Sequence, residues 1–302
     1  MIKYLPKLSI VTPSYNQVSF LEDTILSVLI QQYISLEYII IDGGSTDGSI
    51  DVIKKYQTNL AHWESKSDEG MYDAINRGFE KSSGEVMAYI NSDDLYLPEA
   101  FNVVAELFAR FPNIEWITGR TAYIDEHGNH IDTAKKKLYS RLLLKSGFYQ
   151  SPYCYVVNQN AVFWRRSLWD KIGGRIDERL KLAGDFSLWV LFAEHAQLYW
   201  VDFVLSAFRR HKNQKSFNKL GYMRESKSIK KPSTALLLKI LLGHTRLDRE
   251  ALAAPLITKN DEGEWNIKIM EIPFRARESL RLVERLGRDK VKAAFQLIAS
   301  IV

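Results

Sequence analysis

The first hundred residues alternate between two hydrophobic patterns, and this alternation constrains the fold more than any other feature. Short continuous apolar runs predict strands, and apolar residues spaced by three or four predict helices. The expected strands cover 8–11, 38–41 and 85–90, and the expected helices begin at Ser19 or span 49–56 and 72–80. Ser19 and Glu22 have the spacing of a capping box. Strands that alternate with helices predict a doubly wound, mostly parallel α/β sheet.

Composition excludes several classes of protein for this chain of 302 residues. Hydrophobic residues make up 46% and charged residues 25%, as in ordinary globular domains. The single cysteine, Cys154, excludes an intramolecular disulfide and a cysteine zinc cluster. No apolar run reaches the roughly 18 residues of a membrane span, and the first residues lack the apolar region of a signal peptide. We therefore expect a cytoplasmic protein, either soluble or peripheral on the inner membrane.

Charge divides the chain unevenly. Residues 209–302 hold 21 Lys and Arg against 10 Asp and Glu, a net charge of +11, whereas the first 208 residues carry −6. An acidic body with a basic tail argues against a nucleic-acid partner. The basic helical extension over 216–302 favours contact with an anionic membrane surface, with a solvated helical tail as the alternative. Its apolar stripe, within 282–298, would also suit a homodimer interface.

Two groups of carboxylates follow predicted strands, where ligands bind in sheets of this kind. Asn91-Ser92-Asp93-Asp94 closes one strand, and adjacent carboxylates suit Mn²⁺ or Mg²⁺ bridging to a diphosphate. The alternative is a helix cap before Leu97-Pro98-Glu99. Asp42 ends a second strand before Gly43-Gly44 and could accept hydrogen bonds from a base or ribose; otherwise it forms a turn.

Several blocks in this order together resemble the family 2 glycosyltransferases, which are inverting enzymes of the GT-A fold. The resemblance runs from about Leu8 to His211. It rests on the blocks 12–16, 42–47, 68–78, 91–94 and 182–189. It implies a Rossmann-like, mostly parallel sheet flanked by helices in a GT-A domain over 1–215, with a helical extension over 216–302. Within the domain, 1–110 would bind the nucleotide and 111–215 the acceptor.

The resemblance also implies roles for individual residues. Thr12, Pro13 and Tyr15 would line the nucleobase pocket, Asp42 would hydrogen-bond the pyrimidine ring, and Asp68 would close the other side. Asn91 and Asp93 would lie near the ribose and donor sugar. Asp93 or Asp94 would ligate Mn²⁺ or Mg²⁺, with His211 close to the metal and diphosphate.

An inverting transfer needs a carboxylate that takes the proton of the acceptor hydroxyl. The block Leu182–Trp189 resembles the family segment that carries this base, which indicates Asp185. The alternative, compatible with the first, is an N-cap before a helix that starts at Phe186. Gln159 and Trp164 are further candidates for the acceptor side.

The sequence thus predicts a glycosyltransferase that moves one sugar from a nucleotide diphosphate sugar, with a UDP-sugar favoured. A single addition is expected because the Gln-x-x-Arg-Trp signature of processive synthases is absent. The acceptor would be a glycan or lipid-linked saccharide in cell-surface polysaccharide biosynthesis. A sugar-phosphate nucleotidylyltransferase is the less favoured alternative, since no Gly-rich basic loop follows the first strand. A catalytically silent protein that binds nucleotide sugars or glycans is the other alternative.

Overall fold

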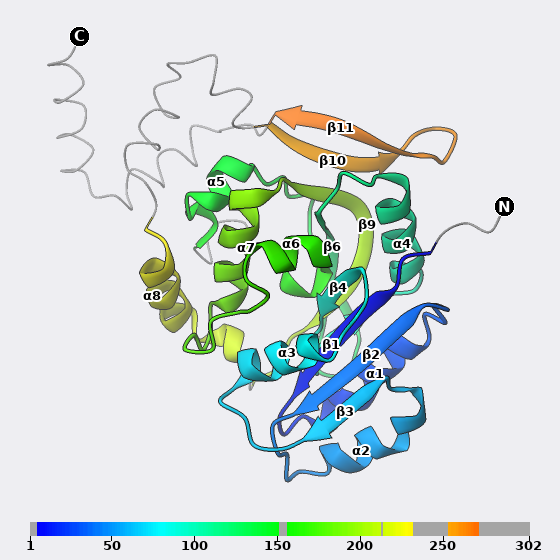
Figure 1. Cartoon of the computed structure of the whole chain (residues 1–302), viewed down its shortest axis with the longest axis vertical. Helices are drawn as coiled ribbons and strands as arrows, with labels where there is room; N and C mark the ends of the chain where they lie inside the picture. The colour runs from blue at the N-terminus through cyan, green and yellow to red at the C-terminus, as the bar shows by residue number, and fades with distance from the viewer. Residues whose placement is uncertain (1–4, 151–155, 213, 232–252, 272–302) are drawn as a thin grey trace, which may run out of the picture.

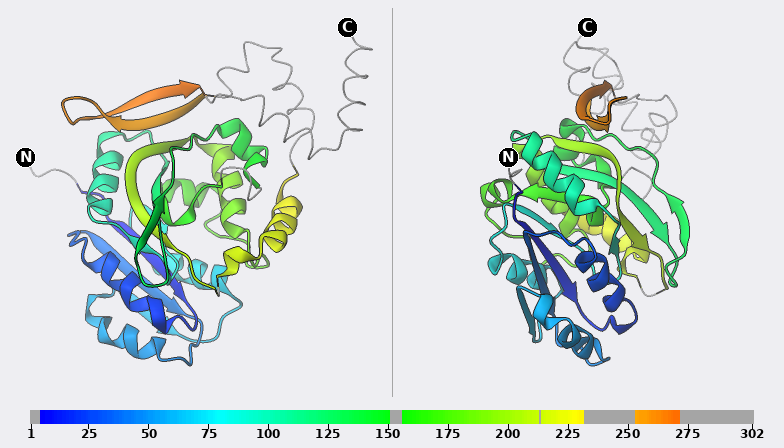
Figure 2. Two further views of the ribbon diagram at one scale, coloured as in Figure 1. Left: turned by 180° about the vertical axis from the view of Figure 1, so that it is seen from behind. Right: turned by 90° about the vertical axis from the view of Figure 1, so that its right-hand side faces the viewer.

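The computed structural model of the chain describes residues 5–150, 156–212, 214–231 and 253–271. One central mixed sheet runs through the molecule, with helices on both of its faces (Figures 1 and 2). Three features predicted from the sequence lie outside the described residues: Cys154, the apolar stripe within 282–298 and most of the basic extension. No helix among the described residues is both long and apolar enough to cross a bilayer.

The strands follow the order β11-β10-β9-β6-β8-β4-β1-β2-β3, with β5 paired to β9 and β7 to β6. The strands are β1 (Leu8–Ser14), β2 (Leu36–Asp42), β3 (His62–Ser65), β4 (Val86–Tyr89), β5 (Leu95–Tyr96), β6 (Trp116–Ile124), β7 (His130–Thr133), β8 (Val162–Arg165), β9 (Leu198–Arg209), β10 (Ala253–Lys259) and β11 (Trp265–Glu271). Strands β4, β1 and β2 are parallel, as predicted, and β3, which was not predicted, adds a further parallel strand. Strand β8, however, lies antiparallel between β4 and β6.

Helices cover the two faces of the sheet and bury two separate cores. The helices are α1 (Val18–Leu29), α2 (Ser49–Lys55), α3 (Met71–Glu80), α4 (Ala100–Arg110), α5 (Arg141–Lys145), α6 (Arg166–Lys171), α7 (Gly184–His195) and α8 (Lys219–Ile229), with short 3₁₀ turns at Gln57–Asn59, Phe148–Gln150, Gln159–Ala161 and Lys215–Phe217. Residues of α1, α2 and α4 pack on one face, and residues of α3, α6 and α7 pack on the other. Because both faces are covered, β1, β2 and β4 are almost entirely buried, as their continuous apolar runs predict.

The start of α1 differs from the predicted capping box. The helix begins at Val18, so Ser19 lies inside it rather than at its cap. The capping acceptors come from another loop instead. Val18 N–H donates to Asp47 Oδ2 at 2.9 Å, and Gln17 N–H donates to Ser49 Oγ at 3.1 Å. The loop after β2 therefore holds the first turn of α1 in place.

The C-terminal extension also differs from the helical segment that was expected. It contains α8, but it continues into a β10–β11 hairpin whose first strand pairs in parallel with β9. The hairpin turn is held by Asn260, whose side-chain oxygen accepts N–H bonds from Glu262 and Glu264, and Gly263 adopts φ +80°. The sheet thus includes strands well past residue 215.

Candidate active site

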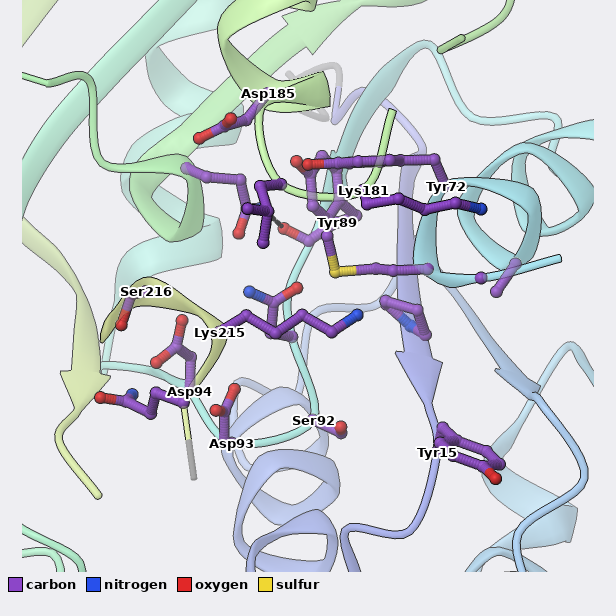
Figure 3. A pocket seen from close by; sticks show the side chains of 18 of the residues that line it. Tyr15, Tyr72, Tyr89, Ser92, Asp93, Asp94, Lys181, Asp185, Lys215 and Ser216 are labelled. Carbon is purple, nitrogen blue, oxygen red and sulfur yellow. Dashed lines mark hydrogen bonds between the residues drawn. The ribbon is translucent and has the colours of Figure 1, made fainter. Parts of the chain in front are cut away.

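A cavity of about 700 Å³ opens at the carboxyl ends of β1 and β4. Loops from both halves of the chain line it, as expected for a parallel α/β sheet. Figure 3 shows Asp185 on one side of this cavity and Asp93 with Asp94 on the other, with Lys215 drawn between them. Tyr15 lies at a separate end. The cavity therefore brings together the carboxylates that the sequence motifs mark.

The part of the cavity lined by Pro13, Tyr15, Gly43 and Asp68 is called the Tyr15 slot below. Tyr15 is 61% exposed, and Pro13, Gly43 and Asp68 line the cavity beside it. The carboxylate of Asp68 lies so close to Gly43 that a Cβ there would stand 2.7 Å from Asp68 Oδ2. Asp68 Oδ1 accepts the N–H of Gly70 at 2.9 Å, and burial raises the pKa of Asp68. This part of the cavity thus presents an exposed phenol ring and a carboxylate acceptor.

Thr12 and Asp42 are not placed as predicted, because both are buried and neither lines the cavity. Thr12 Oγ1 lies 3.1 Å from the phenol oxygen of Tyr38. The carboxylate of Asp42 is occupied by its own neighbourhood. It accepts four hydrogen bonds, from the backbone N–H groups of Gly44 and Ser45 and from the hydroxyls of Ser45 and Ser65. This corresponds to the turn-forming alternative, and no direct contact from Asp42 to a base follows from it.

Asp93 and His211 form the pair best suited to a metal ion. Asp93 Oδ2 lies 2.9 Å from His211 Nε2, and the imidazole packs against the ring of Phe20 with 4.5 Å between centroids. Carboxylate oxygen and imidazole nitrogen are ligands that Mn²⁺ accepts, and diphosphate oxygens can supply the others. Over the described ranges, no three His, Cys, Asp or Glu side chains gather as a complete metal cage. The donor set therefore fits an ion shared with a bound diphosphate.

Asp94 has a different environment from Asp93. It is only 1% exposed, and its Oδ1 accepts the backbone N–H of Arg209 at 3.0 Å. Burial is the main reason why the pKa of Asp94 is raised well above its usual range, and the neighbouring Asp93 adds to it. The sequence left open which aspartate ligates the ion. The geometry favours Asp93 and gives Asp94 a structural contact with β9.

Arg209 holds this end of the site together from the last residue of β9. Its guanidinium is 1% exposed and donates to the backbone oxygens of Asp93 and Glu126 and to Asp23 Oδ2, at 3.0, 3.2 and 2.9 Å. It also lies over the ring of Phe20, at 5.1 Å from the centroid. A buried cation that bridges these segments fixes the position of the Asp93 backbone.

Asp185 lies in the first turn of α7, whose N-cap is Ala183, so the predicted cap position is two residues too late. Its Oδ1 accepts the N–H of Phe186 at 2.7 Å and lies 3.4 Å from the hydroxyl of Tyr222. Burial raises the pKa of Asp185 to about 7. A carboxylate with that pKa is well suited to accept a proton near neutral pH.

Of the two residues predicted for the acceptor side, Gln159 lines the cavity and Trp164 does not. Gln159 lines the cavity, and its Nε2 donates to the backbone oxygen of Tyr89 at 2.5 Å. Its Oε1 is buried without a hydrogen-bond partner in the described part of the chain, as is Asn91 Oδ1. Both acceptors can receive a ligand hydroxyl. The prediction for Trp164 is wrong, because its ring is fully buried in the core against Phe79 and does not line the cavity.

Sequence reasoning missed several side chains that line the cavity, among them Lys181 and Tyr222. Lys181 Nζ donates to the backbone oxygen of Glu69 at 2.8 Å and so links the loop before α7 to the loop before α3. Tyr222 comes from α8, outside the predicted domain, and no motif marks it. The basic residues Lys215 and Lys219, which lie where the C-terminal extension begins, also line the cavity.

The sequence and the fold were compared with known proteins. The family model described as Glycosyl transferase family 2 matches residues 9–170, more than half of the chain. A glycosyltransferase of Rickettsia typhi is 26% identical over 229 residues, which cover 75% of this chain and 71% of that protein. TuaG of Bacillus subtilis, whose name refers to teichuronic acid biosynthesis, is 36% identical over 99 residues. These cover 31% of this chain and 38% of TuaG.

Two solved structures share the fold at low sequence identity. TarS of S. aureus (residues 1–349, with UDP-GlcNAc) aligns with a TM-score of 0.59 at 16% identity, covering 76% of this chain and 69% of that one. The mannosyltransferase PcManGT of Pyrobaculum calidifontis, with GDP-Man and Mn²⁺, aligns with a TM-score of 0.55 at 16% identity, covering 74% and 64%. The family match over residues 9–170 includes the ends of β1 and β4, where the cavity lies. The chain therefore belongs to glycosyl transferase family 2 and is a glycosyltransferase with the GT-A fold.

Proposed function

We propose that this chain transfers one sugar, with inversion, from a nucleotide diphosphate sugar to a hydroxyl of a glycan or lipid-linked saccharide. One observation carries the proposal. A single cavity is lined by Asp185, whose pKa is raised to about 7, and on its other side by Asp93, which His211 contacts from behind the cavity wall. A proton acceptor and a diphosphate site on two sides of one space are what an inverting transfer requires.

In the proposed reaction, the oxygen of the acceptor hydroxyl attacks the anomeric carbon of the donor sugar. Asp185 takes the proton of that hydroxyl at the same time. The new C–O bond forms on the face opposite the departing diphosphate, which inverts the configuration. The bond between the anomeric carbon and the diphosphate oxygen breaks, and its electron pair leaves with the nucleotide. Lys215 reaches into the same cavity and can stabilise the charge that develops on the leaving group.

The donor would lie between the Tyr15 slot and Asp93. Tyr15 would pack against the base, Pro13 would line the slot, and Asp68, rather than the saturated Asp42, would accept a ring N–H. We favour a UDP-sugar because uracil presents one ring N–H to the carboxylate and has no exocyclic amino group that would need a further acceptor. The orphaned oxygens of Asn91 and Gln159 would accept hydroxyls of the ribose or of either sugar. Support also comes from the similar structures, whose bound nucleotide sugars are UDP-GlcNAc and GDP-Man.

Asp93 and His211 would hold Mn²⁺ or Mg²⁺, and the ion would neutralise charge on the diphosphate when bound. Asp94 would keep β9 in register beside them. We further propose that the acceptor is a cell-surface polysaccharide precursor and that the chain lies on an anionic membrane face. Support for that location comes from the net charge of +11 over residues 209–302.

The metal role is tested by calorimetric titration with UDP. UDP should bind at least about tenfold more tightly with Mn²⁺ than with EDTA, a difference of roughly 1.4 kcal/mol. Asp93→Asn should remove most of this difference. Asp132→Asn is the matched control, because Asp132 is an exposed carboxylate on β7. Equal affinity in Mn²⁺ and in EDTA would remove the metal from the proposal, and binding without turnover of any nucleotide sugar would favour the silent binding protein.

A further inference from the structure

Helix α8 lies beyond residue 170, where the family match ends, and beyond the predicted end of the transferase domain. One of its side chains nevertheless forms hydrogen bonds with the loop that precedes Asp185. The carboxylate of Glu225 accepts three consecutive backbone N–H groups, those of Lys181, Leu182 and Ala183, at 2.8, 2.7 and 2.5 Å. No other carboxylate in the described ranges is shown with three consecutive backbone donors.

These three hydrogen bonds hold the residues that lead into α7. Ala183 is the N-cap of the helix that carries Asp185 in its first turn. The N–H groups at a helix start have no partners within the helix, and a carboxylate there is favoured by the helix dipole. Because Glu225 comes from another helix, it caps α7 from outside. Tyr72 completes the cap, since its hydroxyl accepts the N–H of Gly184 at 2.8 Å.

Close packing holds α8 against this loop. Ala183, Phe186 and Val190 of the α7 segment form a small apolar cluster with Tyr222 and Ile229 of α8. The approach is tight at Gly221 on α8, where a Cβ would stand 2.7 Å from Leu182 Cδ1. The hydroxyl of Tyr222 then lies 3.4 Å from Asp185 Oδ1. Helix α8 therefore touches the loop, the helix start and the carboxylate itself.

We propose that α8 completes the active site, with Glu225 as a positioning residue that holds Asp185 toward the acceptor and Tyr222 as a direct hydrogen-bond partner of that carboxylate. This inference rests on the proposed function, because it assigns Glu225 to the base of that reaction. It makes part of the C-terminal extension necessary for turnover and not for binding the donor.

The two α8 residues should move the pH profile in opposite directions. The titratable groups that face Asp185 are Tyr72 from α3, Tyr89 from β4 and Tyr222 and Glu225 from α8, whereas the ammonium of Lys181 in the preceding loop is turned toward the backbone oxygen of Glu69. The negative charge of Glu225 raises the pKa of Asp185, and the Tyr222 hydrogen bond lowers it. Losing the charge should shift the acidic limb of kcat to lower pH, and losing the hydroxyl should shift it to higher pH.

The experiment compares Glu225→Gln, Tyr222→Phe and Glu194→Gln in the full chain. The amide has one acceptor oxygen in place of two, so the loop loses at least one charge-assisted bond. Glu194 is the matched control, since it lies at the far end of α7, where its carboxylate forms a long ion pair with Lys230 at 4.0 Å. The probe is UDP release from UDP-GlcNAc, UDP-glucose and UDP-galactose with Mn²⁺ and water or a saccharide as acceptor, and UDP affinity is titrated separately.

Glu225→Gln should lower the plateau kcat by about tenfold or more, because small misplacements of a catalytic group have effects of this size. Its UDP affinity should stay within about twofold of wild type, and Glu194→Gln should match wild type in both. An unchanged kcat and pH profile for Glu225→Gln and Tyr222→Phe would overturn the inference. So would a shift of both profiles in the same direction. If Glu225→Gln does not fold, Tyr222→Phe alone decides by its upward shift. Failure of the wild type to release UDP would instead overturn the proposed function, and this inference with it.

Discussion

The end of β2 and the start of α7 carry similar sequence signals, but their carboxylates have opposite surroundings. In each, an aspartate stands beside glycine, as Asp42-Gly43-Gly44 and as Gly184-Asp185. Asp42 accepts four hydrogen bonds from its own surroundings. Asp185 accepts one short bond from Phe186 and lies 3.4 Å from Tyr222, and its pKa is raised to about 7.

The difference comes from the neighbours of each carboxylate. At the end of β2, serine hydroxyls and backbone N–H groups point toward Asp42. Its carboxylate oxygens are therefore occupied by hydrogen bonds that stabilise the turn. The start of α7 offers Asp185 few donors, because the backbone N–H groups of Leu182 and Ala183 bind Glu225 instead. A carboxylate that is saturated with donors supports structure, whereas one that lacks them can exchange a proton.

The largest expected effect is at Asp185. Asp185→Asn should lower kcat by roughly 10²–10⁴-fold, because the amide keeps the shape and cannot accept the proton. Donor affinity, measured by titration with UDP and Mn²⁺, should stay close to wild type. Asp177→Asn serves as the control, since the carboxylate of Asp177 forms an ion pair with Arg179. If the Asp185→Asn variant kept more than about a tenth of turnover, the base would have to be another acceptor-side carboxylate.

Asp42→Asn should have its effect on stability. The amide cannot accept all four bonds, so the free energy of unfolding should fall by about 1–3 kcal/mol, the usual cost of unmatched buried donors. Denaturant unfolding measures this, with Asp51→Asn on the exposed side of α2 as the control. Unchanged stability together with a tenfold loss of UDP affinity would contradict the structural role and return Asp42 to the base-binding site.

Gly43→Ala tests whether Asp68 belongs to the donor slot. The added Cβ would stand 2.7 Å from Asp68 Oδ2, so the carboxylate must move. We expect a loss of UDP affinity of roughly tenfold, or about 1.4 kcal/mol. A double-mutant cycle with Asp68→Ala should then be strongly non-additive, because the two residues act through one contact. Additive losses would separate Gly43 from Asp68.

The smallest effect concerns stability against pH. The pKa of Asp185 is raised from 3.8 to about 7 in the folded chain, so its contribution to stability is greatest below about pH 4 and is lost as the pH rises toward 7. Asp185→Asn lacks this loss. Its melting temperature should therefore rise relative to wild type between about pH 4 and pH 7, by about a few degrees. A difference that stays constant over this range would argue against a raised pKa.

Much of the fold could be predicted from the sequence because local patterns determine it. The apolar runs at β1, β2 and β4 and the periodicity of α3 reflect burial on the sheet. The β10–β11 hairpin was missed because its strands carry charged residues, such as Lys268, beside the apolar ones. The start of α1 was missed for another reason, since its capping groups lie about thirty residues away, in the loop after β2.

The site could be predicted only in part. Motifs marked Asp93, His211 and Asp185, and in the structure Asp93 and Asp185 line one cavity, with His211 against Asp93. A motif does not show which way a side chain faces, and so Trp164 was assigned to the acceptor side although it packs in the core. The contacts of Glu225 lie more than forty residues from their partners and leave no local pattern.

Arg209 has a consequence for anyone who builds chimeric transferases. A natural crossover point would be near residue 110, between the nucleotide and acceptor halves. The guanidinium from the second half, however, binds Asp23 and the Asp93 backbone in the first, and His211 follows two residues later. Exchanged halves would therefore mismatch at a buried cation, and a working hybrid would need to inherit 209–211 from the same parent as the donor half.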